Sequence, residues 1–172
     1  ALALLLALWL SGRSLALPPA GPMLAIAFVQ GSGFLALQTW ALVEGGPGKT
    51  AVLIFTMPIW TLLLAWPLLG ERVRGRQWLA AAFTLGGLIL VIEPWAMHGS
   101  HLSKLLGILA ALCWAIGTIL IKRLRIAHRV DLLNLTAWQL ALGAVPLVAL
   151  ALAVPERPTD WTAHFAVILL VM

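Results

Sequence analysis

Residues 50–95 decide the fold class: they read TAVLIFTMPIWTLLLAWPLLG (50–70), ERVRGR (71–76) and QWLAAAFTLGGLILVIEPW (77–95). The first run, Thr50 to Leu69, is uncharged over twenty residues. At about 1.5 Å of rise per residue it covers a hydrocarbon core of about 30 Å. The second run, Gln77 to Ile92, is shorter and also uncharged. A soluble helical hairpin would show a polar stripe along each helix, and neither run has one. The stretch therefore predicts a transmembrane hairpin whose basic tip, residues 71–76, lies in water on the cytoplasmic side.

The composition places the whole chain in a membrane. Of its 172 residues 62% are apolar and 10% are charged, whereas a soluble domain is about 45–50% apolar and about 25% charged. A soluble core would not hide so much apolar surface. The net charge of +5 comes from basic residues concentrated in the turns between spans, so membrane topology explains it and no nucleic-acid partner is expected. We expect an all-α fold, a polytopic transmembrane helix bundle with the lipid bilayer as its partner.

The apolar runs predict five complete and two partial spans. The complete spans run from Met23 to Val43, Thr50 to Leu69, Gln77 to Ile92, Leu105 to Ile121 and Leu132 to Val154, and the partial ones occupy residues 1–10 and 163–172. Prolines at 18, 19 and 22 are expected to keep the loop before the first complete span out of a helix. Residues 44–48 (EGGPG) predict a tight turn, and Gly31-Ser32-Gly33 predicts a narrow face where a second helix comes close. Because both ends lie inside apolar runs, we expect a fragment of a longer membrane protein.

The basic residues predict an orientation. Alternate loops on one side hold eight of them: Arg13, then Arg72, Arg74 and Arg76, then Lys122, Arg123, Arg125 and Arg129. The other side holds three: Lys49, Lys104 and Arg157. Cytoplasmic loops of membrane proteins carry the excess of Lys and Arg. The loops at 71–76 and 122–131 are therefore predicted to be cytoplasmic.

Three features together carry a family resemblance. A Thr-x-Pro (residues 56–58) lies within an apolar helix that ends in Leu-Gly-Glu (69–71), and the next helix carries a Gly-Gly pair (86–87) before its apolar end. These resemble the fourth and fifth helices of EamA-type transporters of the drug/metabolite transporter superfamily. Trp-Ala-Ile-Gly (114–117), in a helix that ends in Lys-Arg (122–123), resembles the helix that opens the second half of such a protein.

The resemblance implies ten helices arranged as two five-helix repeats of opposite orientation. Residues 1–95 would be the first repeat, from part of helix two to helix five, and residues 96–172 would be helices six, seven and the start of eight. The first and last helices of the family would be absent. The family places its termini in the cytoplasm, which agrees with the charge distribution. The implied function is transport of a small organic metabolite or drug-like compound across a bacterial inner membrane by alternating access. A homodimer is left open.

The lack of charged residues inside the complete spans limits the kinds of functional site that we expect. No Asp, Glu, Lys, Arg or His lies at mid-membrane depth in a complete span, so the usual mark of a proton relay is missing. We expect no catalytic residue and no cofactor. His98 and His101 lie three apart in a loop without a third ligand, so no metal site is expected either.

Polar and aromatic residues inside the spans are the candidates for substrate binding. A glutamine is costly to bury and must find a partner, which favours Gln38 and Gln139 as pore-lining residues. An interhelical hydrogen bond is the equally weighted alternative. Tryptophans away from the span ends offer area to a flat or cationic compound. These arguments select Trp40, Trp114 and Trp138 beside the two glutamines.

The Thr-x-Pro segment supplies the other candidates. Pro58 leaves one backbone hydrogen bond unmade, and irregular helices at membrane depth are tolerated where they line a cavity. Thr56 and Trp60 are four residues apart and therefore share a face. The alternative for this group is a proline kink that only shapes packing.

Two rival functions remain. A membrane-embedded enzyme needs a nucleophile, an acid–base pair or a metal cluster at one depth, and the sequence holds no such constellation. A non-transporting assembly subunit would also fit a chain of this length.

Overall fold

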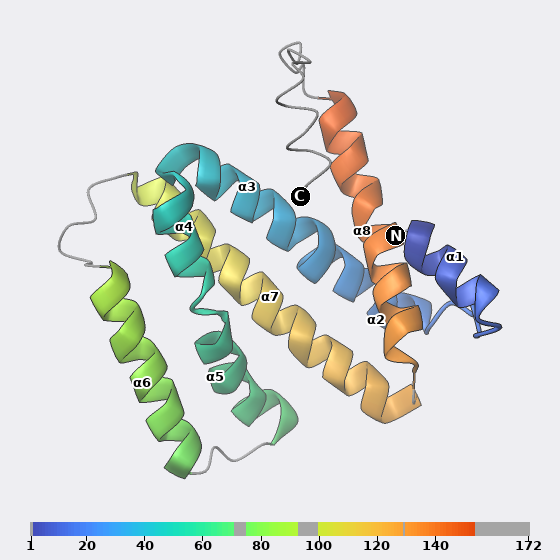
Figure 1. The fold of residues 1–172 in the computed structure, drawn as a ribbon, viewed down its shortest axis with the longest axis horizontal. Coiled ribbons are helices and arrows are strands. Elements are labelled where there is room, and N and C mark those ends of the chain that lie inside the picture. The colour runs from blue at the N-terminus through green and yellow to red at the C-terminus, as the bar shows by residue number, and fades with distance from the viewer. Residues whose placement is uncertain (1, 71–74, 93–99, 129, 154–172) are drawn as a thin grey trace.

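The computed structural model describes residues 2–70, 75–92, 100–128 and 130–153 (Figure 1). All of its elements are helices, which confirms the all-α prediction. Their bounds are α1 (Leu2–Leu10), α2 (Ala20–Ile26), the π-helical η1 (Ala27–Gly33), α3 (Phe34–Gly45), α4 (Pro47–Ile54), α5 (Met57–Leu69), α6 (Gly75–Ile92), α7 (His101–His128) and α8 (Leu132–Ala153). The predictions for residues 71–74 and 93–99, for Arg129 and for the partial span at 163–172 lie outside the described residues.

Four stretches are long and apolar enough to cross a membrane: Ala20–Gly45, Pro47–Leu69, His101–His128 and Leu132–Ala153. They correspond to four of the five predicted complete spans. The fifth prediction, Gln77 to Ile92, coincides with α6, an 18-residue helix that is not among the four. Large apolar side chains are exposed on most of these helices, as expected where lipid is the solvent. The multi-pass membrane fold is confirmed.

Helix α7 is the central element of the bundle. It packs against α2, η1, α3, α4 and α5, and in Figure 1 it runs diagonally between α3 and α5. Its buried face is rich in small residues, namely Gly107, Ala110, Ala111, Ala115 and Gly117. Small residues let helix backbones approach closely, which is how membrane helices gain packing contacts without a hydrophobic driving force. This face fixes the positions of the spans around α7.

The first complete span begins earlier than predicted. Pro19 precedes the first helical residue of α2, and Pro22 lies within the first turn of that helix. The prediction that all three prolines stay in the loop is therefore wrong for Pro22. The physical reason is that the first four N–H groups of a helix have no intrahelical partner, so a proline there removes no hydrogen bond.

The predicted turn at residues 44–48 is confirmed as a one-residue connection. Gly46 has φ 79°, which favours glycine, and Pro47 starts α4. Beside this turn the hydroxyls of Thr50 and Ser103 both donate to the carbonyl of Ala41, each at 3.0 Å. These two bonds join α3, α4 and α7 at what we call the Gly46 end of the bundle.

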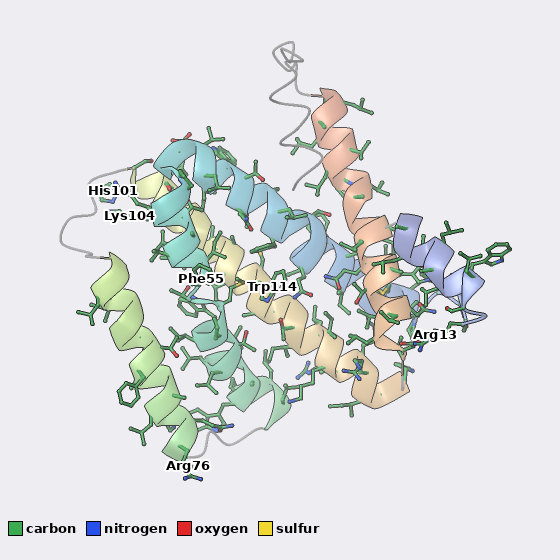
Figure 2. All side chains as sticks on the ribbon, in the orientation of Figure 1. Arg13, Phe55, Arg76, His101, Lys104 and Trp114 are labelled. Atoms are coloured by element: carbon green, nitrogen blue, oxygen red, sulfur yellow. The ribbon has the colours of Figure 1, made fainter. Side chains whose placement is uncertain are left out.

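Three of the predicted basic residues lie at the opposite end, which we call the basic end. Arg13 pairs with Asp131 at 3.0 Å, and the guanidinium of Arg123 donates to the carbonyl of Leu68. Figure 2 shows Arg76 at this end, with His101 and Lys104 at the other. The structure thus places Arg13, Arg76 and Arg123 at one end, as the alternation of the loops predicts.

Candidate functional site

The strongest polar constellation inside the spans joins η1, α7 and α8. Gln30 on η1 is only 6% exposed. Its Nε2 donates to Thr118 Oγ1 at 3.3 Å and to the Trp114 carbonyl at 3.4 Å. Its Oε1 accepts from Nε2 of Gln139 on α8 at 3.1 Å. We call Gln30, Thr118 and Gln139 the amide cluster.

The amide cluster gives the buried Gln30 its hydrogen-bond partners and leaves part of the hydrogen-bonding capacity of Gln139 unused within the cluster. Nε2 of Gln30 has two neighbouring acceptors and its carbonyl oxygen has a donor, as a buried amide requires. The bond to Gln30 uses one N–H of Gln139, whereas an amide has a second N–H and an oxygen with two lone pairs. Gln139 is half-buried. Gln139 therefore keeps hydrogen-bonding capacity beyond the cluster.

Glycines bring these helices close enough for the cluster to form. A Cβ on Gly117 would lie 2.3 Å from Cβ of Gln30, so only glycine fits opposite the glutamine. A Cβ on Gly31 would lie 3.1 Å from Cα of Gly143. Ser32 donates to the Gly143 carbonyl at 2.9 Å. The predicted narrow face at residues 31–33 is confirmed, and it packs on α8.

The backbone of η1 is itself unusual. Residues 27–33 form a π-helix between α2 and α3, and this wider turn carries Gln30. Single π-turns inside α-helices occur frequently at functional sites. No sequence signal pointed to this turn.

An open groove of about 460 Å³ adjoins the cluster between α5 and α7. Its lining is mainly apolar: Phe55, Met57, Pro58, Thr61, Leu62, Ala65, Trp114 and Thr118. Thr118 belongs both to this α5–α7 groove and to the amide cluster. Trp114 is held edge-on by Phe34, with ring centroids 4.8 Å apart and planes at 61°. Figure 2 shows Trp114 on α7 near the middle of the bundle, close to Phe55.

The Thr-x-Pro segment forms a break between α4 and α5. Residues 55 and 56 are not helical, and the N–H of Thr56 bonds to the Leu53 carbonyl at 3.2 Å, three residues back. Thr56 Oγ1 donates to that same carbonyl at 2.6 Å and accepts from the Trp60 indole N–H at 3.1 Å. The predicted shared face of Thr56 and Trp60 is confirmed. Their polar atoms bond to each other and to Leu53, and Pro58 is the residue of this group that lines the groove.

The structure brings some predicted site residues together and separates others. Pro58 and Trp114 line the α5–α7 groove, and Gln139 lies one hydrogen bond away from Gln30, which contacts Thr118. Trp138 donates its indole N–H to the Leu15 carbonyl at 3.2 Å and packs on the core around Leu135. Gln38, half-buried, and Trp40, 54% exposed, lie on α3 and do not line the groove.

Sequence reasoning missed Gln30, the centre of the cluster. The rule that a buried glutamine must find a partner was applied to Gln38 and Gln139, and it applies equally to Gln30. Its position directly before Gly31-Ser32-Gly33 was the available signal, since small residues mark a helix contact. Thr118 was not selected either.

The groove and the amide cluster together offer hydrogen-bond donors, acceptors and an aromatic face. None of the groove's lining residues in the described part of the chain is charged. Within the described ranges no three His, Cys, Asp or Glu side chains lie together in a way that would hold a metal ion. The geometry suits reversible binding of an organic molecule through shape and hydrogen bonds.

Comparison with known proteins identifies the family. The model of the EamA-like transporter family matches residues 1–93 and 101–172. The chain belongs to this family. As an EamA-like chain it is related to named transporters of the drug/metabolite transporter superfamily.

Three relatives illustrate the range of the family. The uncharacterized transporter YoaV of Bacillus subtilis is 28% identical over 145 residues, which are 80% of this chain and 48% of that protein. A riboflavin transporter of Rhizobium johnstonii is 30% identical over 133 residues, which are 74% of this chain and 40% of that protein. A probable amino-acid metabolite efflux pump of Escherichia coli is 28% identical over 142 residues, which are 79% of this chain and 46% of that protein. The EamA-like chain spans about half the length of the curated relatives that it matches. No solved structure matches it significantly.

Proposed function

We propose that this EamA-like chain is part of a membrane transporter that moves a small organic compound by alternating access. The observation that carries the proposal is the amide cluster, which opens through Thr118 onto the α5–α7 groove beside Trp114. Relatives named as a riboflavin transporter and as a probable amino-acid metabolite efflux pump support a small metabolite as the cargo.

The site would lie between two repeats, residues 1–95 and 96–172. Gln30 comes from the first segment, and Thr118 and Gln139 come from the second. Secondary transporters built from inverted repeats bind their substrates at the repeat interface near the bilayer midplane. Rocking of one repeat against the other would make and break contacts across this interface. The hydrogen bonds of the amide cluster cross it and would therefore change during transport.

The proposed orientation places the basic end in the cytoplasm of a bacterial inner membrane. Support comes from the excess of Lys and Arg at residues 71–76 and 122–131, of which residues 122–128 form the end of α7 and not the predicted loop. Arg76 and the end of α7 lie at the same end of the bundle as the Arg13–Asp131 pair.

The rival functions have less support. A membrane-embedded enzyme would need reactive groups in the groove, and the lining residues that the structure describes carry hydroxyl, thioether, aromatic and aliphatic side chains. For an assembly subunit the amide cluster would serve only to hold helices together, and the cavity beside it would have no role. A transport assay on the purified protein distinguishes a transporter from an enzyme and from an assembly subunit.

The test is a matched pair of threonine variants in the full-length protein, reconstituted in liposomes. Thr118 and Thr136 each donate to the carbonyl four residues back in their own helix, at 2.9 Å and 2.8 Å. Only Thr118 also accepts a bond from Gln30 and lines the groove. Uptake of radiolabelled riboflavin and of the twenty amino acids would identify a cargo. We expect Thr118→Val to lower its initial rate at least about fivefold and Thr136→Val to leave it unchanged, because a hydrogen bond to substrate contributes about 1 kcal/mol. Equal rates for both variants would contradict the proposed site, and failure of the unsubstituted protein to move any of these compounds would contradict metabolite transport.

A further inference from the structure

A second cavity continues from the groove to the basic end of the bundle. It has a volume of about 670 Å³ and is lined by Thr118, Ile121, Lys122, Arg125, Ile126 and Val130. Thr118 lines both this cavity and the α5–α7 groove. The residues at 114, 118, 122 and 125 recur at helical spacing, so one face of α7 leads from Trp114 to the basic end. We call this second cavity the basic vestibule.

The vestibule has a positive wall. Lys122 and Arg125 line it, and none of its lining residues in the described part of the chain is acidic. Asp131 lies next to the lining residue Val130, and both of its oxygens are engaged: Oδ2 pairs with Arg13 at 3.0 Å and Oδ1 accepts the Leu133 N–H at 3.0 Å. The other acidic residue in the described part of the chain, Glu44, is on α3 next to the Gly46 turn, at the opposite end.

Not every basic residue on α7 contributes to this wall. Arg123 points its guanidinium at the Leu68 carbonyl and so ties the end of α5 to α7. Topology requires positive residues at this end of the bundle, and a helix C-terminus favours them. Neither requirement explains why Lys122 and Arg125 line a cavity that continues into the groove. Helical side chains point back toward the N-terminus of their helix, so both can reach toward Thr118.

We propose that the basic vestibule receives the anionic group, a carboxylate or a phosphate, of an organic solute whose uncharged part contacts Thr118 and Trp114. This inference rests on the proposed transport function and narrows its substrate class to organic anions. Lys122 and Arg125 stand four and seven residues beyond Thr118, which is about 6 Å and about 10 Å along the helix. Two cations between low-dielectric walls also raise the local concentration of anions.

The test measures the electrostatic potential in the vestibule directly. In a Cys113→Ala background, Thr118→Cys places one thiol where the two cavities meet, and Ile121→Cys places a second reporter in the vestibule alone. The full-length protein is held in phosphatidylcholine nanodiscs, which expose both faces. Each thiol is reacted with the anionic reagent sulfonatoethyl methanethiosulfonate and the cationic reagent trimethylammonioethyl methanethiosulfonate. The ratio of the two rates is normalised to that of free mercaptoethanol.

We expect the anionic reagent to be favoured at both positions. Arg125→Gln and Lys122→Gln should each lower the normalised ratio about fivefold, as one charge at this range implies. The matched control Arg76→Gln removes a charge from the same end, on α6 and outside the vestibule, and should leave the ratio unchanged. A ratio equal to that of the free thiol, an equal fall with Arg76→Gln, or unreactive thiols at both positions would each overturn the proposal.

A second arm separates a solute from a lipid headgroup, which offers the same anionic chemistry. Nanodiscs that contain phosphatidylglycerol should give the same reaction rates, since we assign the site to a soluble anion. If phosphatidylglycerol slows the anionic reagent at Ile121→Cys and the slowing disappears in Arg125→Gln, the site holds a lipid and the proposal is wrong. The readout does not depend on transport, so its failure is distinguishable from failure of the proposed function.

Discussion

Gln139 donates a hydrogen bond from Nε2 to Oε1 of Gln30 at 3.1 Å, and this bond joins α8 to the π-helical turn of the first complete span. The two residues are 109 positions apart in the sequence. Gln30 is buried, so its oxygen depends on Gln139 for a donor. Loss of the Gln139 amide would therefore leave a buried oxygen without its donor.

Gln139→Leu should destabilise the protein more than the loss of one side chain suggests. It leaves the buried Oε1 of Gln30 without a partner, which costs about 1–3 kcal/mol in soluble proteins, and polar bonds between membrane helices average near the low end of such values. The midpoint of thermal unfolding in detergent should fall by several degrees. Gln38→Leu removes a half-buried glutamine outside the cluster and gives the comparison for loss of an amide alone. If both variants unfold at the same temperature, the hydrogen bond from Gln139 to Gln30 does not stabilise the protein.

Gly117→Ala should disrupt the same cluster from the opposite side. The added Cβ would lie 2.3 Å from Cβ of Gln30, and overpacking of this kind costs about 1–3 kcal/mol. Gly87→Ala is the matched control, since a Cβ there meets nothing within 4 Å. That control should be neutral or stabilising by up to about 1 kcal/mol, because alanine is the better helix former. Equal melting temperatures for the two variants would contradict the close approach of η1 and α7.

The two hydroxyls on the Ala41 carbonyl predict non-additive behaviour at the Gly46 end. Either Thr50→Val or Ser103→Ala leaves the carbonyl with one hydroxyl donor, so each should cost little, about 0.5–1 kcal/mol. The double variant leaves a buried carbonyl without either hydroxyl and should cost more than the sum. Unfolding free energies of the four proteins in a double-mutant cycle measure the difference. Strict additivity would show that the two bonds are independent.

Cysteine labelling tests the proposed orientation. Gly48 and Gly75 are exposed, and a Cβ at either position meets nothing within 4 Å. In a Cys113→Ala background, an impermeant maleimide should label Gly48→Cys in intact cells and label Gly75→Cys only after the membrane is opened. The reverse pattern would invert the topology.

Local sequence signals predicted the spans and the turn but not the pairing between helices. Uncharged runs located the four confirmed spans, and the glycines at 45, 46 and 48 marked the turn, because length and turn chemistry are local properties. The Pro58 signal predicted an irregular helix. The bonds of the Thr56 hydroxyl to Leu53 and Trp60 at this break were not predicted.

The candidate site was predicted only in part for the same reason. Gln139 was selected because an amide is costly in lipid, yet its partner lies 109 residues away and no periodicity marks it. Trp138, its neighbour, was selected for its depth, and its indole bonds to the Leu15 carbonyl instead of facing the groove. Whether a buried polar group meets another helix or a cavity depends on how the helices pack, which one sequence does not display.

The double variant Gln30→Leu/Gln139→Leu tests the central claim most directly. Replacing both partners by apolar residues leaves neither amide unpaired, and such pair replacements are nearly neutral for stability. Thr118 keeps its bond to the Trp114 carbonyl. The variant should therefore melt close to the unsubstituted protein while its transport rate per reconstituted molecule falls at least about tenfold. A double variant that melts normally and transports at the full rate would show that the amide cluster only holds the helices together.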